Sequence, residues 1–218
     1  MEDGRTGRPT SRLFTRERVK AAACWYMHTW HHMRVEGSEY LPTQGPALLL
    51  GNHASYLDLP ALLAMDPYPD TTILALASLF KVPILRQVLQ AWDAIPVERR
   101  GRDIAAVRRL LRALSERRVV AVSVEGRRSR TGRLGEIHPV LAEITATVEV
   151  PIVPLGVIGS FRALPYGAMF PKRHEIIVRL GHPLMIPRGT TSSEARRQIG
   201  DAISALLPAE QQPLSKSR

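Results

Sequence analysis

The sequence predicts an α/β protein in which a mostly parallel central sheet is flanked by helices. Two observations support this prediction: short apolar runs alternate with helical patterns along the chain, and that alternation is typical of βαβ units. The length agrees, because 218 residues suffice for one large core and are short for two domains. We therefore expect one domain over residues 14–207, a flexible lead-in at 1–13 and a flexible tail at 208–218.

The first expected element is a helix over residues 16–35, which is rich in aromatic and basic side chains. Its apolar residues are spread widely around the helix, and two interpretations stay open. The helix packs on the domain, or it lies at a membrane interface with its tryptophans at headgroup level. Our predicted fold includes the interfacial helix. His28, His31 and His32 share helical spacing, but no Cys or acidic residue stands beside them, so we interpret them as packing or surface residues.

From residue 46 onward, apolar runs predict strands, and longer amphipathic or capped patterns predict helices. The predicted strands are residues 46–52, 71–77, 93–98, 117–126, 150–159 and 174–181. The predicted helices are residues 57–66, 80–92, 103–116, 137–148 and 192–207. Asp103 is the expected N-cap of the helix that follows it. In such sheets the functional loops follow the carboxyl ends of the strands.

The composition limits the compartment and the partners. The net charge of +10, with 26 Arg against 4 Lys, favours anionic partners such as phosphorylated metabolites, an anionic membrane or nucleic acid. No stretch of 18 uncharged apolar residues occurs, so no transmembrane helix is predicted. The N-terminus lacks the apolar core of a signal peptide. The single cysteine, Cys24, excludes an intrachain disulfide and fits a reducing cytoplasm.

The stretch GNHASYLD, residues 51–58, follows a predicted buried strand. It places His53 five residues before Asp58. If a helix begins here, the chain folds back and brings the carboxylate to the imidazole, which fixes the ring's tautomer and leaves the other nitrogen free to act as a base. The alternative is an ordinary structural histidine at a strand end. Ser55 is too close to His53 in sequence for an easy nucleophile triad.

Two arginine-rich loops also follow predicted strands. The first contains Arg99, and its neighbours Arg100 and Arg102 lead into a helix, where arginines can cradle a phosphate. The second, residues 123–133, holds four arginines around Gly126, which permits close backbone approach. We expect Glu125 in this loop to be paired with arginine. Together with the histidine–aspartate pair, these loops suit reaction of a hydroxyl on a phosphorylated substrate.

The order of these motifs resembles the glycerolipid acyltransferase family typified by bacterial 1-acylglycerol-3-phosphate acyltransferases. Four blocks of that family occur in order over residues 37–185. The first, N-H-x-x-x-x-D, is complete in residues 52–58; DAIPVER, residues 93–99, matches the second loosely. VEGRRS, residues 124–129, keeps the Glu-Gly, Arg and Ser of the third, and residues 150–154 read VPIVP like the fourth. The domain predicted at 14–207 is thus expected to be an acyltransferase domain.

The resemblance implies roles for individual residues. His53 is the general base on the acceptor hydroxyl, and Asp58 orients it. Arg99 holds the acceptor's phosphate. Three further residues shape the acceptor site: Glu125, Gly126 and Arg128. Arg128 also lies near the phosphate. No metal or other cofactor is implied, and acyl-CoA or an acyl carrier protein serves as co-substrate.

The reaction so implied is transfer of a fatty acyl group to a lysophospholipid, most simply 1-acylglycerol-3-phosphate giving phosphatidic acid. The chain departs from the family pattern at Asp93, Val124, Arg127 and Val140. An ornithine lipid or another lysophospholipid therefore stays open as the acceptor. A basic lipid-binding or nucleic-acid-binding protein is the non-enzymatic alternative, although no nucleic-acid recognition motif is present. We expect a peripheral protein on the cytoplasmic face of an anionic membrane, with no nucleic-acid partner.

Overall fold

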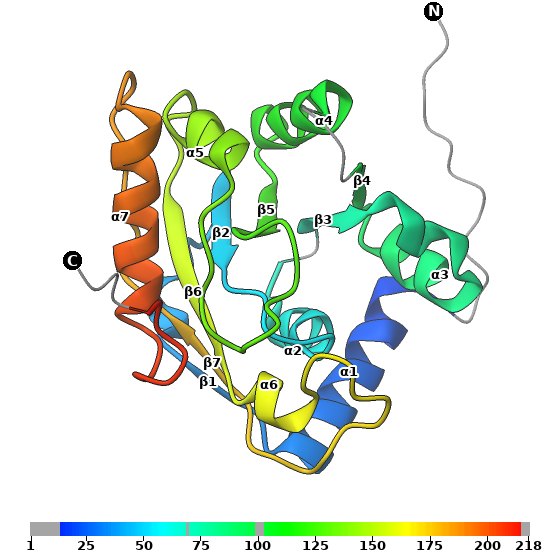
Figure 1. The fold of residues 1–218 in the computed structure, drawn as a ribbon. Helices are drawn as coiled ribbons and strands as arrows, with labels where there is room; N and C mark the ends of the chain where they lie inside the picture. The colour runs from blue at the N-terminus through cyan, green and yellow to red at the C-terminus, as the bar shows by residue number, and fades with distance from the viewer. Residues whose placement is uncertain (1–13, 69, 99–102, 215–218) are drawn as a thin grey trace, which may run out of the picture.

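The computed structural model describes residues 14–68, 70–98 and 103–214 (Figure 1). These residues form a seven-stranded sheet in the order β1-β7-β6-β2-β5-β3-β4. The strands are β1 (Arg34–Glu36), β2 (Ala47–Gly51), β3 (Thr72–Leu76), β4 (Ile95–Val97), β5 (Val119–Ser123), β6 (Ile152–Ile158) and β7 (Ile177–Leu180). All neighbouring pairs are parallel except β6 and β7. The predicted single, mostly parallel sheet is confirmed.

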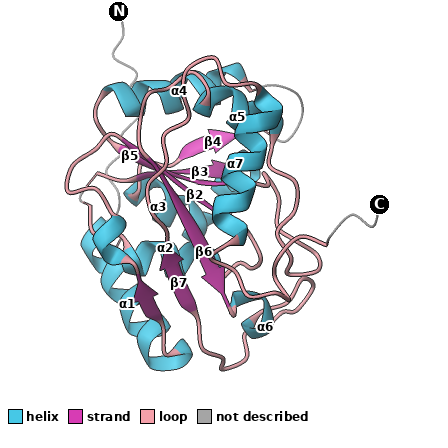
Figure 2. Cartoon of the chain, turned by 90° about the vertical axis from the view of Figure 1, so that its left-hand side faces the viewer, coloured by secondary structure: helices cyan, strands magenta, loops and turns pink. Residues whose placement is uncertain are grey.

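Helices cover both faces of this sheet (Figures 1 and 2). Their bounds are α1 (Arg16–His31), α2 (Asp58–Met65), α3 (Pro83–Ala91), α4 (Ile104–Ser115), α5 (Pro139–Thr145), α6 (Ser160–Ala163) and α7 (Ser192–Ser204). One core cluster joins the sheet to α1, α2 and α3, and a second joins it to α4, α5 and α7. Within the described residues, no helix has both the length and the hydrophobicity needed to cross a bilayer.

The central strand β2 shows how the sequence produces these layers. Leu49 packs in the cluster with α1 and α2, whereas Leu48 and Leu50 pack in the cluster with α4 and α5. Successive side chains of a strand point to opposite faces, so a strand buried on both sides reads as a continuous apolar run. β2 ends at Gly51, and the residues after it lie at the carboxyl edge of the sheet.

Several element bounds differ from the prediction. The helix predicted to reach residue 35 ends at His31, because His32 adopts a left-handed conformation with φ 46°. Arg34–Glu36 then form β1, which pairs with β7. This three-residue edge strand forms because it pairs with a strand about 140 residues away along the chain. A local sequence pattern does not reveal such a partner. Asp103 caps α4 as predicted, since its side chain accepts a hydrogen bond from Ala106 N–H at 2.9 Å.

Candidate active site

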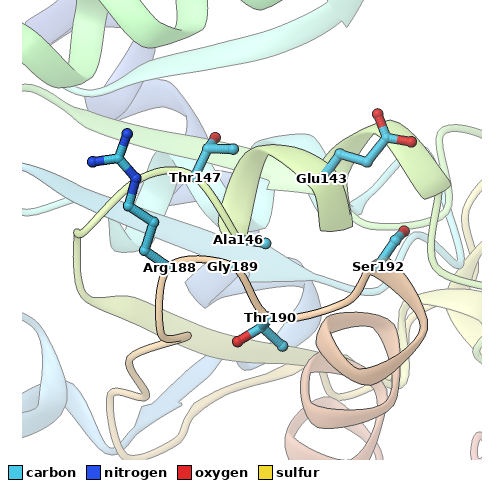
Figure 3. A pocket seen from close by; sticks show the side chains of 7 residues that line it. All are labelled: Glu143, Ala146, Thr147, Arg188, Gly189, Thr190 and Ser192. Carbon is cyan, nitrogen blue, oxygen red and sulfur yellow. The ribbon is translucent and has the colours of Figure 1, made fainter.

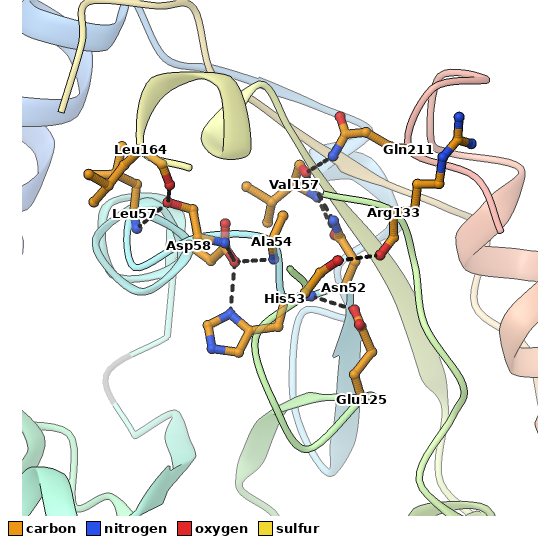
Figure 4. Close-up of polar contacts among 12 residues, drawn as sticks. Asn52, His53, Ala54, Leu57, Asp58, Glu125, Arg133, Val157, Leu164 and Gln211 are labelled. Atoms are coloured by element: carbon orange, nitrogen blue, oxygen red, sulfur yellow. Dashed lines mark hydrogen bonds and ion pairs between the residues drawn. The ribbon is translucent and has the colours of Figure 1, made fainter. Parts of the chain in front are cut away.

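His53 and Asp58 meet at the carboxyl edge of β2. The Nδ1 atom of His53 lies 2.8 Å from Oδ2 of Asp58 (Figure 4). The aspartate side chain is 9% exposed and the histidine side chain 29% exposed, so the ring lies at the surface above a buried carboxylate. A carboxylate only accepts hydrogen bonds, so the Nδ1 atom carries the proton and Nε2 carries the lone pair. The second ring nitrogen points away from Asp58 and can take a proton from a bound hydroxyl.

The turn between β2 and α2 is built around the same carboxylate oxygen. Oδ2 of Asp58 also accepts hydrogen bonds from the backbone N–H groups of Ala54 and Ser55, at 2.7 and 2.8 Å. These bonds satisfy donors that precede the first turn of the helix, as N-terminal carboxylates do. The five-residue spacing therefore follows from a turn that must close before α2 begins.

Ser55 belongs to this turn and does not serve as a nucleophile. Its hydroxyl is fully buried, donates to the carbonyl of Leu164 at 2.9 Å and accepts from Leu57 N–H at 3.2 Å. Asn52, the first residue of the motif, has an equally structural task. Its amide makes two hydrogen bonds with the backbone of Val157 on β6, at 2.7 and 3.1 Å (Figure 4). The asparagine thus fixes the end of β2 to its neighbouring strand, directly before His53.

Glu125 supports the backbone of the histidine. Its Oε1 accepts a hydrogen bond from His53 N–H at 2.9 Å (Figure 4), and its carboxyl group also accepts from Gly135 N–H. Burial raises the pKa of Glu125 to about 7, although these backbone bonds and His53 oppose the shift. The expectation that Glu125 pairs with arginine was wrong: within the described residues no ion pair includes it. Its partners are main-chain amides because the carboxylate points inward, beneath the loop.

The residues around Glu125 explain two features of the third block. Gly126 has φ 64°, and a Cβ atom there would lie 3.1 Å from Cδ2 of His138. Glycine adopts this left-handed conformation without strain. Val124 is fully buried, and its N–H donates to Gly51 O at 2.9 Å. Proline, the family's residue there, has no N–H to make this bond. Val124 therefore faces the core and does not line the surface that an acceptor meets.

Arg128 is held between two tyrosines that the sequence analysis missed. Its guanidinium carbon lies 3.7 Å from the ring centroid of Tyr56 and 4.6 Å from that of Tyr166. One guanidinium nitrogen, Nη1, is buried without a hydrogen-bond partner in the described part of the chain. A planar cation stacked in this way is fixed in position and retains donors for an anion such as phosphate. Tyr56 lies inside the His-to-Asp spacing, which was the available signal; Tyr166 is distant in sequence.

The second block is only partly placed. Arg99 lies outside the described residues, so its predicted role stays a prediction. Asp93, which stands where the family has glycine, has φ 47°. This is a left-handed conformation, which glycine adopts without strain and which Asp tolerates better than most other residues. Its carboxylate pairs with Arg118 at 2.6 Å. Arg127, the other departure near the site, is exposed.

A separate pocket lies away from these residues. Figure 3 shows its lining at the end of α5 and the start of α7, where the side chains of Glu143, Thr147, Arg188 and Ser192 surround it. The end of α5 leads into the amino end of β6, whereas His53 follows the carboxyl end of the parallel strand β2. The pocket therefore belongs to the opposite edge of the sheet. Within the described residues, no three His, Cys, Asp or Glu side chains are grouped as metal ligands.

The site combines a carboxylate-oriented histidine with a stacked arginine at the carboxyl edge of an α/β sheet. Comparison with known proteins identifies the family. The model of the Acyltransferase family matches residues 32–158, more than half of the chain, and the protein belongs to that family. The predicted family membership is thereby confirmed.

Individual relatives are more distant. The chain is 25% identical over 211 residues to the chloroplastic 1-acyl-sn-glycerol-3-phosphate acyltransferase BAT2 of Brassica napus, covering 91% of this chain and 61% of that protein. It is 28% identical over 192 residues to the 1-acyl-sn-glycerol-3-phosphate acyltransferase of Cocos nucifera, covering 84% and 61%. It thus spans about three fifths of these relatives. The crystal structure of the 1-acyl-sn-glycerophosphate acyltransferase PlsC from Thermotoga maritima has the same fold, with a TM-score of 0.74 at 20% identity over 92% of this chain and 83% of that one.

Proposed function

We propose that this protein is an O-acyltransferase that moves a fatty acyl group from acyl-CoA or acyl carrier protein to the hydroxyl of a lysophospholipid. The favoured acceptor is 1-acylglycerol-3-phosphate, which becomes phosphatidic acid. The observation that carries the proposal is the 2.8 Å contact between His53 Nδ1 and Asp58 Oδ2. The names of the relatives agree with the acceptor, since two of them are 1-acyl-sn-glycerol-3-phosphate acyltransferases.

The proposed chemistry uses only these groups and the two substrates. The Nε2 atom of His53 removes the proton from the acceptor hydroxyl as its oxygen attacks the thioester carbonyl. The carboxylate of Asp58 stabilises the imidazolium that forms. The tetrahedral intermediate then collapses, the carbon–sulfur bond breaks, and the thiolate receives the proton from the imidazolium. Atoms and charges balance without a metal or redox cofactor.

The acceptor is held by its phosphate in this proposal. Arg128 is the described cation best placed for that contact, because its guanidinium is stacked on Tyr56 and has a buried nitrogen without a partner. A guanidinium donates paired hydrogen bonds to phosphate oxygens. Arg99, outside the described residues, is the second proposed phosphate ligand. We place the protein at the cytoplasmic face of a membrane, where its acceptor is embedded.

The experiment compares the wild type with His53→Ala, using labelled acyl-CoA or acyl carrier protein and a panel of acceptors. We expect phosphatidic acid from 1-acylglycerol-3-phosphate, and a loss of activity of about a hundredfold or more in the variant. His182→Ala is the matched control, because it removes an exposed histidine whose ring contacts that of Tyr40, outside the site. Activity that survives in His53→Ala refutes the base assignment. Preference for an ornithine lipid or another lysophospholipid corrects the acceptor alone.

A further inference from the structure

The connection between α6 and β7, residues 164–176, exposes two large apolar side chains at its tip. Met169 is 84% exposed and Phe170 is 78% exposed. Single apolar residues are common on protein surfaces, but two large neighbouring ones at the tip of a loop are a feature of interaction sites. Figure 1 shows this 164–176 loop in gold, beside α1.

The exposure of the tip is imposed by the way the loop is fastened. Near its start, Ala168 N–H donates to Pro165 O at 3.1 Å, and past the tip Lys172 N–H donates to Ala163 O at 2.7 Å. Farther on, Arg173 donates to the ring of His32 at 2.7 Å. These bonds close the loop on both sides of Met169 and Phe170, so the loop presents the two side chains outward.

The charge around the tip is positive. Lys172 and Arg173 follow the apolar pair after one proline, and Arg130 lies with its guanidinium 5.3 Å from the ring centroid of Tyr166. Glu175, the acidic residue of the loop itself, is paired with Arg34 at 3.0 Å, and Glu210 is paired with Arg162 at 3.2 Å. Among the described residues, no ion pair includes Lys172, Arg173 or Arg130. An apolar tip with unneutralised cations beside it complements the surface of an anionic bilayer.

The same loop is bonded to the candidate active site. Its first residue, Leu164, accepts the hydrogen bond from Ser55, and Tyr166 stacks on Arg128. Met169 is three positions after Tyr166 in the chain, a span of about 11 Å at most. A bilayer that receives the tip therefore lies close to the cation proposed to hold the acceptor's phosphate. Trp30, partly exposed in the last turn of α1, precedes the histidines that contact the loop.

From this arrangement we propose that the 164–176 loop is a membrane-docking element, which inserts Met169 and Phe170 into an anionic phospholipid bilayer and sets the site of His53 at headgroup depth. The inference rests on the proposed function in one respect, namely that the acceptor is a membrane lipid. It assigns the primary membrane contact to this loop, and the last turn of α1 lies beside the loop.

The test measures co-sedimentation of the purified full chain with phosphatidylcholine vesicles, with and without phosphatidylglycerol. For Met169→Asp/Phe170→Asp we expect binding to the anionic vesicles to fall roughly tenfold to a hundredfold. Phe170→Leu should stay within about threefold of the wild type, since it keeps an apolar side chain. Met185→Asp is the matched control, because Met185 is also exposed but lies after β7, outside the loop. Lys172→Gln should weaken binding only to the anionic vesicles.

Three results overturn the proposal. The double variant binds vesicles as tightly as the wild type, the wild type does not bind vesicles, or the wild type is a dimer in solution and the double variant is a monomer. The last result assigns the tip to a second copy of the chain. Activity separates this inference from the proposed function. The double variant should keep wild-type activity on a dispersed short-chain acceptor and lose it on a vesicle-embedded one, whereas His53→Ala should lose both activities and still bind vesicles.

Discussion

Replacement of Asp58 by Asn removes a charge and preserves the shape of the site. The oxygen Oδ2 receives three hydrogen bonds, from His53 Nδ1 and from two backbone N–H groups. The other oxygen, Oδ1, is buried without a hydrogen-bond partner in the described part of the chain. The asparagine amide nitrogen can therefore occupy the position of Oδ1 while the amide oxygen keeps all three donors. The variant isolates the contribution of the negative charge.

The size of the effect follows from the distance between the charges. Two unit charges about 4 Å apart interact by about 4 kcal/mol at an effective dielectric constant near 20. The histidine side chain is 29% exposed, so solvent weakens this interaction. We take about 2–4 kcal/mol, which corresponds to a rate loss of roughly 30-fold to 1,000-fold. Since the imidazolium forms only during the reaction, the loss should fall on kcat, and KM should change by less than about threefold.

The assay is steady-state transfer of a labelled acyl group to 1-acylglycerol-3-phosphate, together with urea unfolding of each variant. We expect Asp58→Asn to lose about 1–3 kcal/mol of unfolding free energy, because its amide N–H groups are buried without acceptors. Asp66→Asn is the matched control, as Asp66 is equally buried but bonds Thr71 and Trp92 instead of a catalytic group. It should lose stability and keep kcat. A folded Asp58→Asn enzyme with more than about one tenth of wild-type kcat refutes the reasoning.

Three other variants test the surrounding residues. Burial raises the pKa of Glu125 to about 7 from 4.5, so the folded state binds this proton more tightly than the unfolded state does. The unfolding free energy of the wild type should therefore fall by roughly 1–3 kcal/mol between about pH 4.5 and pH 7.5. In urea unfolding, Glu125→Gln should lack this dependence on pH. Arg128→Lys keeps the charge but not the stacked plane, so KM for a phosphorylated acceptor should rise about tenfold or more, and KM for the thioester donor should not. Gly126→Ala should cost about 1–2 kcal/mol in unfolding free energy, since φ is 64° and the new Cβ meets His138. The argument for Glu125 is contradicted if Glu125→Gln keeps the pH dependence of the wild type. The arguments for Arg128 and Gly126 are contradicted if Arg128→Lys keeps the wild-type KM for the acceptor, or if Gly126→Ala keeps the wild-type urea midpoint.

The fold was predictable where it depends on the hydrophobic pattern within a single helix or strand. The run ALLLG in β2 is apolar at every position because both faces are covered, and the pattern of α4 is amphipathic because one side meets the sheet. These periodicities predict element type and order. Strand β1 was missed because its three residues contain no distinctive pattern and pair with β7, which lies far along the chain. The same limit applies to the antiparallel direction of β7 beside β6.

The candidate site divides in the same way. His53 and Asp58 are five residues apart, so the turn that joins them is local, and the sequence alone indicated it. The partners of Glu125 and Arg128 are not local. Glu125 was expected among arginines and instead accepts main-chain N–H bonds from His53 and Gly135. Arg128 needs Tyr166, which reaches it only because α6 follows β6 at the same edge of the sheet.

By itself, then, the sequence determined the class of fold, the family resemblance, and the histidine–aspartate spacing, since each depends on neighbours within one turn or one strand. The tertiary structure decided what lies beside that pair: the carboxyl group of Glu125 under the histidine, the tyrosines around Arg128, and the outward tip of the 164–176 loop. These features depend on which strands are adjacent and on what remains uncovered after the core is packed. Both are properties of the assembled chain, and a local stretch of residues does not contain them.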